Sequence, residues 1–153
     1  MKQTLVSQIP TLQNTNVTNK HCLVRVDFNV PIKDGKITSL TRILAAKPTI
    51  DYLLKAKAKV ILLSHLSRIK SIDDIKSGKK SLAPVAAELR KLYPKYTVTF
   101  VKDNHSKKLP ALIKRMNSNQ IILLENTRYQ DVNLKTKQVI KLESKNNHNL
   151  AKF

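Results

Sequence analysis

The sequence KVILLS, at residues 59–64, decides the fold. It is a short and nearly uninterrupted apolar run, which is typical of a parallel β-strand that is covered on both faces. The preceding residues 49–58, TIDYLLKAKA, carry apolar side chains at helical spacing. A helix that leads into a buried strand is the repeating step of an α/β fold.

The same alternation continues on both sides of this stretch. Upstream, CLVRVD at residues 22–27 predicts a strand, followed by a turn at Asp34-Gly35. We expect Thr41 to cap a helix that Pro48 breaks or restarts. Downstream, the pattern predicts a helix at 82–93 capped by Ser81, a strand at 97–101, a helix at 109–116 and a strand at 120–125. The fold class is therefore α/β, with a parallel sheet and helices on both faces in a Rossmann-like three-layer arrangement.

Length and composition allow one domain. A chain of 153 residues that is 41% hydrophobic can bury roughly two-thirds of its unfolded surface around a single core. No run approaches the roughly 18 to 20 apolar residues of a membrane helix, and the first residues contain no apolar signal-peptide core. We expect a cytoplasmic protein that does not bind membranes. The single cysteine, Cys22, lies among apolar residues and is expected to be a small buried hydrophobe.

The formal net charge of +19 is the strongest compositional signal, and in a small domain it points to an anionic partner such as nucleic acid. The lysines, however, recur along almost the whole chain, with few aromatic residues between them and no zinc-finger or RNA-binding motif. A solvated lysine surface explains this distribution equally well. A non-catalytic protein that binds nucleic acid or another polyanion is the alternative function.

Polar residues collect where the predicted strands end. Asp27 and Asn29 follow the first strand, His65 and Arg68 follow KVILLS, and Glu125, Asn126 and Arg128 follow QIILL. Parallel strands place their carboxyl ends on one edge, where such sheets bind ligands. With Arg42 added from the start of a helix, this edge presents several groups suited to phosphate or carboxylate.

Each of these residues also has an ordinary structural explanation. Asp27 and Asn29 can shape a turn, His65 can end a strand, and the arginines can be surface cations. The sequence contains no GxxxxGK[ST] and no GxGxxG loop, and its four histidines are too scattered for a metal site or a catalytic triad. The residues alone predict an α/β domain with a candidate anion site and no metal site.

Three blocks of sequence resemble the phosphoglycerate kinase family. They are VRVDFNVPIKDGKITSLTRILAAKPTIDYLLKAKAKVILLSHLSRIK, KSLAPVAAEL and ILLENTRY, which together cover about residues 22–130 in the family's order. The resemblance implies reversible phosphoryl transfer from 1,3-bisphosphoglycerate to ADP, giving 3-phosphoglycerate and ATP in glycolysis. It also implies a monomeric enzyme that uses magnesium with ADP or ATP.

The resemblance assigns roles to residues at the strand ends. Asp27, Phe28 and Asn29 correspond to the first substrate-contacting turn, and His65, Leu66, Ser67 and Arg68 correspond to the second. Arg128 corresponds to a further cation for the triose phosphate. Arg42 corresponds to the arginine near the transferred phosphoryl group, where a positive charge stabilises the transition state.

The chain departs from the family pattern in two ways. Ser67 and Ile69 stand where the family usually has Gly and Pro, and a positive φ at Ser67 would cost roughly 1 to 2 kcal/mol and disturb Arg68. By resemblance, residues 1–153 form a partial N-terminal triose-binding domain, without the C-terminal domain that binds nucleotide and magnesium. We therefore expect no useful turnover from this chain alone and an unpaired sheet edge. A decayed gene product is a third interpretation, which Ser67 and Ile69 favour.

Overall fold

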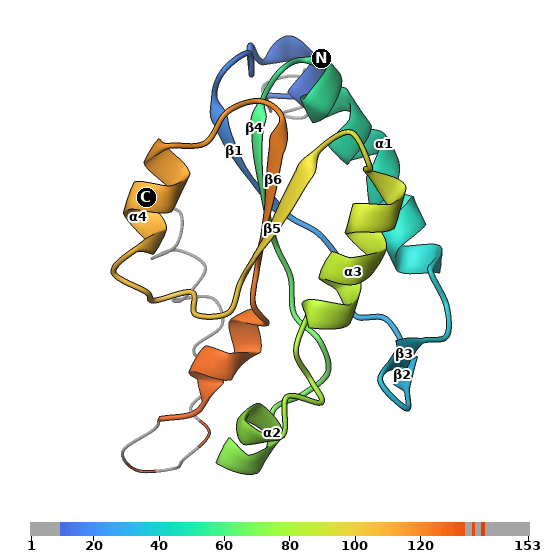
Figure 1. Ribbon diagram of the computed structural model, residues 1–153, viewed down its shortest axis with the longest axis vertical. Coiled ribbons are helices and arrows are strands. Elements are labelled where there is room, and N and C mark those ends of the chain that lie inside the picture. The colour runs from blue at the N-terminus through green and yellow to red at the C-terminus, as the bar shows by residue number, and fades with distance from the viewer. Residues whose placement is uncertain (1–9, 134–135, 137–138, 140–153) are drawn as a thin grey trace, which may run out of the picture.

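Four parallel strands form the central sheet of the computed structural model, which describes residues 10–133, 136 and 139 (Figure 1). The strands are β1 (His21–Arg25), β4 (Lys59–Leu63), β5 (Thr97–Val101) and β6 (Gln120–Leu124), in the spatial order β1-β4-β6-β5. Each strand pairs in parallel with its neighbour. The predicted parallel sheet is confirmed, and three of its strands end one or two residues earlier than expected.

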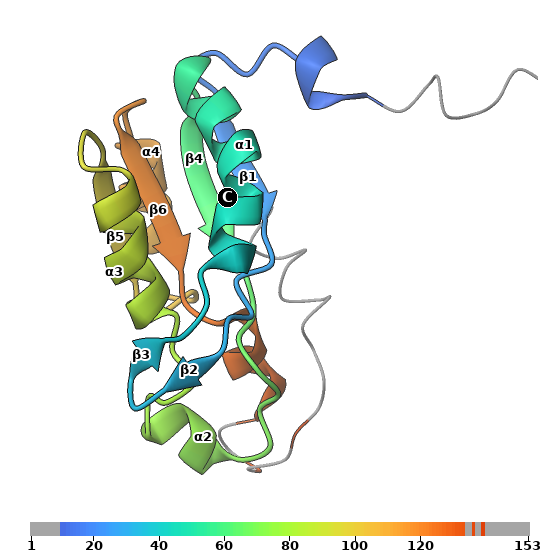
Figure 2. The ribbon, with the colours of Figure 1, turned by 90° about the vertical axis from the view of Figure 1, so that its right-hand side faces the viewer.

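The helices lie on both faces of this sheet, as Figures 1 and 2 show. The helices α1 (Thr41–Lys55) and α3 (Ala83–Leu92) cover one face, and α4 (Leu109–Lys114) covers the other. Beyond the carboxyl ends of the strands lie α2 (Ile72–Lys76), the hairpin of β2 (Ile32–Lys33) and β3 (Lys36–Ile37), and the 3-10 turn η3 (Thr127–Asp131). A further short turn, η2 (Leu12–Asn14), precedes β1.

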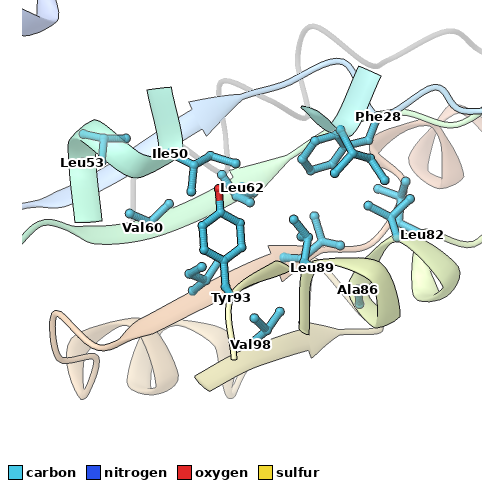
Figure 3. Packing of buried hydrophobic residues seen from close by; sticks show 14 of the residues in the cluster. Phe28, Ile50, Leu53, Val60, Leu62, Leu82, Ala86, Leu89, Tyr93 and Val98 are labelled. Atoms are coloured by element: carbon cyan, nitrogen blue, oxygen red, sulfur yellow. The ribbon is translucent and has the colours of Figure 1, made fainter. Parts of the chain in front are cut away.

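Alternate side chains of β4 and β6 belong to two separate cores. Val60 and Leu62 pack toward α1 and α3 (Figure 3). Ile121 and Leu123 belong to the same cluster. Ile61, Leu63, Ile122 and Leu124 pack on the α4 side. All eight are at most 4% exposed. Burial on both faces explains why these strands are uninterrupted apolar runs rather than alternating ones.

The helix α1 differs from the sequence-based expectation. It is one helix that continues through Pro48, and Thr41 is its first residue rather than its cap. Pro48 is exposed, so its ring displaces nothing in the core, while Ile43 and Ile50 anchor the helix from within it. The hydroxyl of Ser39 accepts a 3.4 Å hydrogen bond from the Thr41 N–H, which partly replaces the expected cap.

The predicted turn at Asp34-Gly35 is confirmed, because both residues have positive φ, at 49° and 74°, and connect β2 to β3. Positive φ at two successive residues is the requirement of the tightest hairpin turns. The short helix α2 was not expected from the sequence.

None of the helices in the described part of the chain is both long and apolar enough to cross a membrane.

Candidate functional site

The loops that follow β1, β4 and β6 meet at Ser67. The Ser67 N–H donates to Asn29 Oδ1 at 2.8 Å, which joins the first loop to the second. A guanidinium nitrogen of Arg128 donates to the Ser67 carbonyl at 3.0 Å, which joins the third. The structure thus brings the predicted residues of all three strand ends together at one edge of the sheet.

Ser67 itself has a left-handed backbone. Its φ is 56°, in the region that favours glycine. Ser67, which stands where the family usually has Gly, therefore does have the positive φ that we expected to be strained. Hydrogen bonds on both sides of the Ser67 peptide hold this conformation, and the side chain of Arg68 follows directly and is exposed.

The side chain of Asn126 connects the loop after β4, the loop before α3 and the turn after β6 through hydrogen bonds. Its side-chain oxygen accepts hydrogen bonds from the N–H groups of Leu66 and Arg128, both at 3.1 Å. Its amide nitrogen donates to the carbonyls of Leu66 and Lys80, at 2.7 and 2.9 Å. Because Asn126 is fully buried and uses all of this capacity on backbone groups, its role is structural.

Asp27 and Arg42 form an ion pair at the carboxyl end of β1. Both side chains are about half exposed, at 56% and 48%. Asp27 also accepts a 3.0 Å hydrogen bond from the Asn29 N–H, so it shapes the turn as well. The pair lies in an open groove of about 300 Å³ between β1 and α1, whose walls include Val24 and Ala45.

Two of the residues that we assigned to substrate contact by resemblance have buried side chains. Phe28 is 0% exposed and Leu66 is 2% exposed, and both belong to the core beneath α1 and α3. The Phe28 N–H donates to the hydroxyl of Ser64 at 2.9 Å. Their side chains therefore hold the neighbouring polar residues in place. His65, between Ser64 and Leu66 in the chain, is half-buried.

The carboxylate of Glu125, which follows β6, is buried against the start of α3 and is fully hydrogen-bonded there. Its carboxylate accepts hydrogen bonds from the Ser81 hydroxyl at 2.6 Å, the Leu82 N–H at 2.8 Å and the Asn126 N–H at 2.7 Å. It supplies the negative charge that a helix N-terminus favours. Burial, followed by the charges of Glu125 and Asp74, raises the pKa of the nearby Tyr129.

Asn104 was not identified from the sequence. It exchanges two hydrogen bonds with the backbone of Glu125, at 2.6 and 2.8 Å, and is 2% exposed. The available signal was its place after the strand at 97–101, which matches that of the other strand-end residues.

The arginines give this edge its chemical character. Arg42, Arg68 and Arg128 come from three different segments, while Asp27 is paired with one of them and Glu125 is buried. Such a set suits an anion with several oxygen atoms. Within the described residues, no three His, Cys, Asp or Glu side chains gather as metal ligands.

Known proteins are similar to this chain in sequence and in fold. The family model described as phosphoglycerate kinase matches residues 12–153. A phosphoglycerate kinase of Malacoplasma penetrans is 50% identical over 141 residues, which are 91% of this chain and 30% of that protein. The enzyme of Mycoplasma pneumoniae is 48% identical over 94% of the chain and 34% of its own length. The solved phosphoglycerate kinase of Coxiella burnetii aligns with a TM-score of 0.61 at 37% identity, over 77% of this chain and 28% of that one. The chain thus spans about a third of the length of these relatives.

Proposed function

The chain belongs to the phosphoglycerate kinase family, and from this premise we propose that it supplies the triose-phosphate-binding part of a phosphoglycerate kinase. The reaction is phosphoryl transfer from 1,3-bisphosphoglycerate to ADP, giving 3-phosphoglycerate and ATP. The single observation that carries the proposal is the convergence of three loops and three arginines at one edge of the parallel sheet.

The geometry supports separate roles for the arginines. Arg128 is fixed to the Ser67 carbonyl, and with the exposed Arg68 it offers the triose phosphate two planar donors. Arg42 lies one loop away beside Asp27. We assign it to the transferred phosphoryl group, whose developing negative charge it would stabilise without needing to reorganise. Asn29 and His65 would orient the ligand between these cations.

The nucleotide and its magnesium ion are assigned to a second domain that corresponds to the part of the relatives beyond the matched third. Magnesium neutralises phosphate charge when it is bound. The described residues of this chain would hold and orient the triose. The proposal includes a cytoplasmic, monomeric complete enzyme, and it predicts no ATP formation by the 153-residue chain assayed alone.

Binding of 3-phosphoglycerate to the 153-residue chain, measured by isothermal titration calorimetry, tests the proposal. We expect saturable binding that weakens at least tenfold in Arg68→Met and in Arg128→Met, because each variant loses a charged hydrogen-bond donor. Lys95→Met is the matched control, since this exposed lysine precedes β5 at the opposite edge of the sheet. It removes the same charge and should change the affinity less than about twofold.

Two results would contradict the proposal. One is the absence of 3-phosphoglycerate binding by a chain that circular dichroism shows to be folded. The other is an equal loss of affinity in Lys95→Met and the two arginine variants, together with a steep dependence on salt. That second pattern would favour the general polyanion binder.

A further inference from the structure

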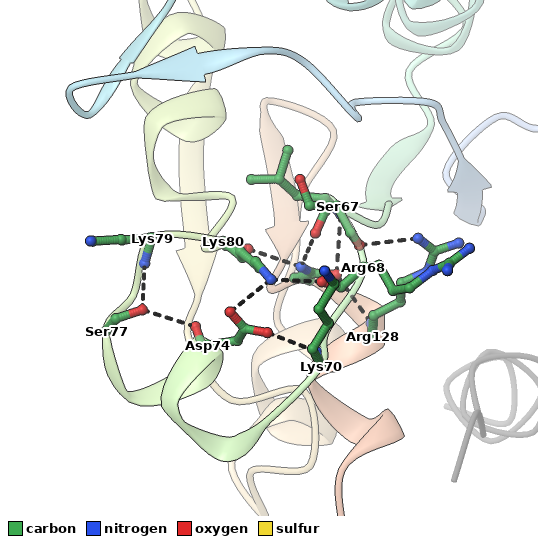
Figure 4. Close-up of polar contacts among 10 residues, drawn as sticks. Ser67, Arg68, Lys70, Asp74, Ser77, Lys79, Lys80 and Arg128 are labelled. Carbon is green, nitrogen blue, oxygen red and sulfur yellow. Dashed lines mark hydrogen bonds and ion pairs between the residues drawn. The ribbon is translucent and has the colours of Figure 1, made fainter. Parts of the chain in front are cut away.

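Lys80 bridges the loop that carries Arg68 to the start of α3. Its ammonium group lies 2.7 Å from a carboxylate oxygen of Asp74 and donates a 2.7 Å hydrogen bond to the Arg68 carbonyl (Figure 4). The other carboxylate oxygen of Asp74 accepts from the Lys70 N–H, also at 2.7 Å. The three contacts close a ring around the backbone of residues 68–70.

This ion pair is more enclosed than the pair formed by Arg42 and Asp27. The side chains of Lys80 and Asp74 are 22% and 24% exposed, whereas those of Arg42 and Asp27 are 48% and 56% exposed. The hydrogen bond from Lys80, and then that from the Lys70 N–H, hold the pKa of Asp74 below its ordinary value. Enclosed and charge-assisted contacts are stronger than exposed ion pairs, which contribute little.

The loop needs such an anchor because of its conformation. Ser67 is left-handed, and both Ser67 and Arg68 are exposed. The Ser67 N–H donates to Asn29 and the Ser67 carbonyl accepts from Arg128, but neither bond holds the next carbonyl, that of Arg68. Lys80 holds it.

We propose that Lys80, held by Asp74, is a positioning residue that fixes the Arg68 backbone so that its guanidinium faces the triose phosphate. The inference rests on the proposed function, because it assigns Arg68 to substrate binding. Lys80 acts through Arg68 and does not itself touch the substrate. Without Lys80, the strained Ser67-Arg68 segment would sample other conformations. Substrate binding would then have to order this segment, which costs free energy and weakens the affinity.

The neighbouring lysine provides a matched comparison. Lys79 carries the same charge one residue away and is exposed. In Figure 4 the Lys79 side chain points away from Arg68. Affinity for 3-phosphoglycerate should fall about tenfold in Lys80→Met and less than about twofold in Lys79→Met, since the two variants lose equal charge but only one loses the contact. Lys80→Arg, which keeps a cationic donor, should recover most of the loss.

Asp74→Ala separates positioning from simple attraction. This variant removes a negative charge near an anion site, so electrostatics alone predicts tighter binding. Positioning predicts weaker binding, because Lys80 loses the group that holds it. Tighter binding in Asp74→Ala would overturn the inference, and so would equal effects of Lys79→Met and Lys80→Met.

A double-mutant cycle tests whether Lys80 acts through Arg68. In an Arg68→Met background, Lys80→Met should produce little further loss of affinity, because the residue that it positions is gone. An additive loss would mean that Lys80 acts independently of Arg68 and would refute the proposal. If the unmodified, folded chain does not bind 3-phosphoglycerate, the proposed function fails. If it binds and the Lys80 variants do not differ from the control, only this inference fails.

Discussion

Ser67 is the residue on which the candidate site depends most closely. Three loops converge on its peptide, and its own backbone is in the left-handed region. For a residue with a Cβ atom, this region costs roughly 1 to 2 kcal/mol. The surrounding hydrogen bonds hold the strained conformation at a position next to a proposed substrate-binding arginine, as is common at functional sites.

Ser67→Gly should raise the free energy of unfolding by about 0.5 to 1 kcal/mol. The gain is the relieved strain less the greater conformational entropy that glycine loses on folding. Both Ser67 backbone hydrogen bonds remain possible in the variant. Urea denaturation followed by circular dichroism measures the difference.

Ser77→Gly is the matched control for this change. Ser77 is the C-cap of α2, has an ordinary φ of −69°, and donates its hydroxyl to the Asp74 carbonyl at 3.2 Å. Glycine there relieves no strain and loses this contact, so it should lower the free energy of unfolding by about 1 to 2 kcal/mol. If both glycine variants destabilise the protein equally, the strain assigned to Ser67 is absent.

At the scale of single elements, the start of α3 shows how tertiary contacts replace a local cap. The sequence predicted that Ser81 caps this helix, but the N-cap position is Leu82, whose side chain makes no cap hydrogen bond. The Ser81 hydroxyl, one residue earlier, accepts a 3.1 Å hydrogen bond from the Ala83 N–H. The same hydroxyl donates to Glu125, whose carboxylate also accepts from the Leu82 N–H. The carboxylate of Glu125, which follows β6, therefore takes the place of a local side-chain cap at the start of α3.

Glu125→Gln should lower the free energy of unfolding by about 2 kcal/mol. The variant removes the charge at the α3 N-terminus and places an amide donor among groups that are already donors. Glu88→Gln, on the same helix, removes a carboxylate that pairs with the exposed Lys91 and should cost less than about 1 kcal/mol. Comparable losses in urea denaturation would show that Glu125 does not cap α3.

The sequence predicted the elements whose signal is local. Apolar runs such as KVILLS located the strands, and Asp34-Gly35 located the hairpin turn. It did not predict α1 as one helix, because the anchoring of Ile43 and Ile50 in the core outweighs the local effect of Pro48. The short helix α2 lacks the length for a periodic pattern.

The candidate site could likewise be predicted only where its signal is local to the sequence. Its location could be predicted, because every strand of a parallel sheet delivers its carboxyl end to one edge. The sequence could not predict which side chains face a ligand and which ones support the loops. Phe28 and Asn126 lie within the same motifs as Asn29 and Arg128, and only the packing shows that the first two are buried.

At the scale of the whole molecule, charge is out of balance. The chain has 29 Lys and Arg residues against 10 Asp and Glu residues, so at least 19 cations lack a carboxylate of their own. In the described part, the carboxylates of Asp27, Asp51, Asp74 and Glu88 are already engaged in ion pairs. The remaining cations repel one another, and this repulsion favours expanded states of the chain.

The free energy of unfolding should therefore increase with salt, by on the order of 1 kcal/mol between about 0.05 and 0.5 M NaCl. Added ions shorten the range of repulsion between lysines, whereas they weaken only the few exposed ion pairs. Lys95→Glu lowers the net charge by two at an exposed position, so it should stabilise the protein most at low salt and lose that advantage at high salt. Thermal unfolding across the salt series measures both effects. A free energy of unfolding that falls with salt would mean that specific ion pairs, such as Lys80 with Asp74, outweigh the net repulsion.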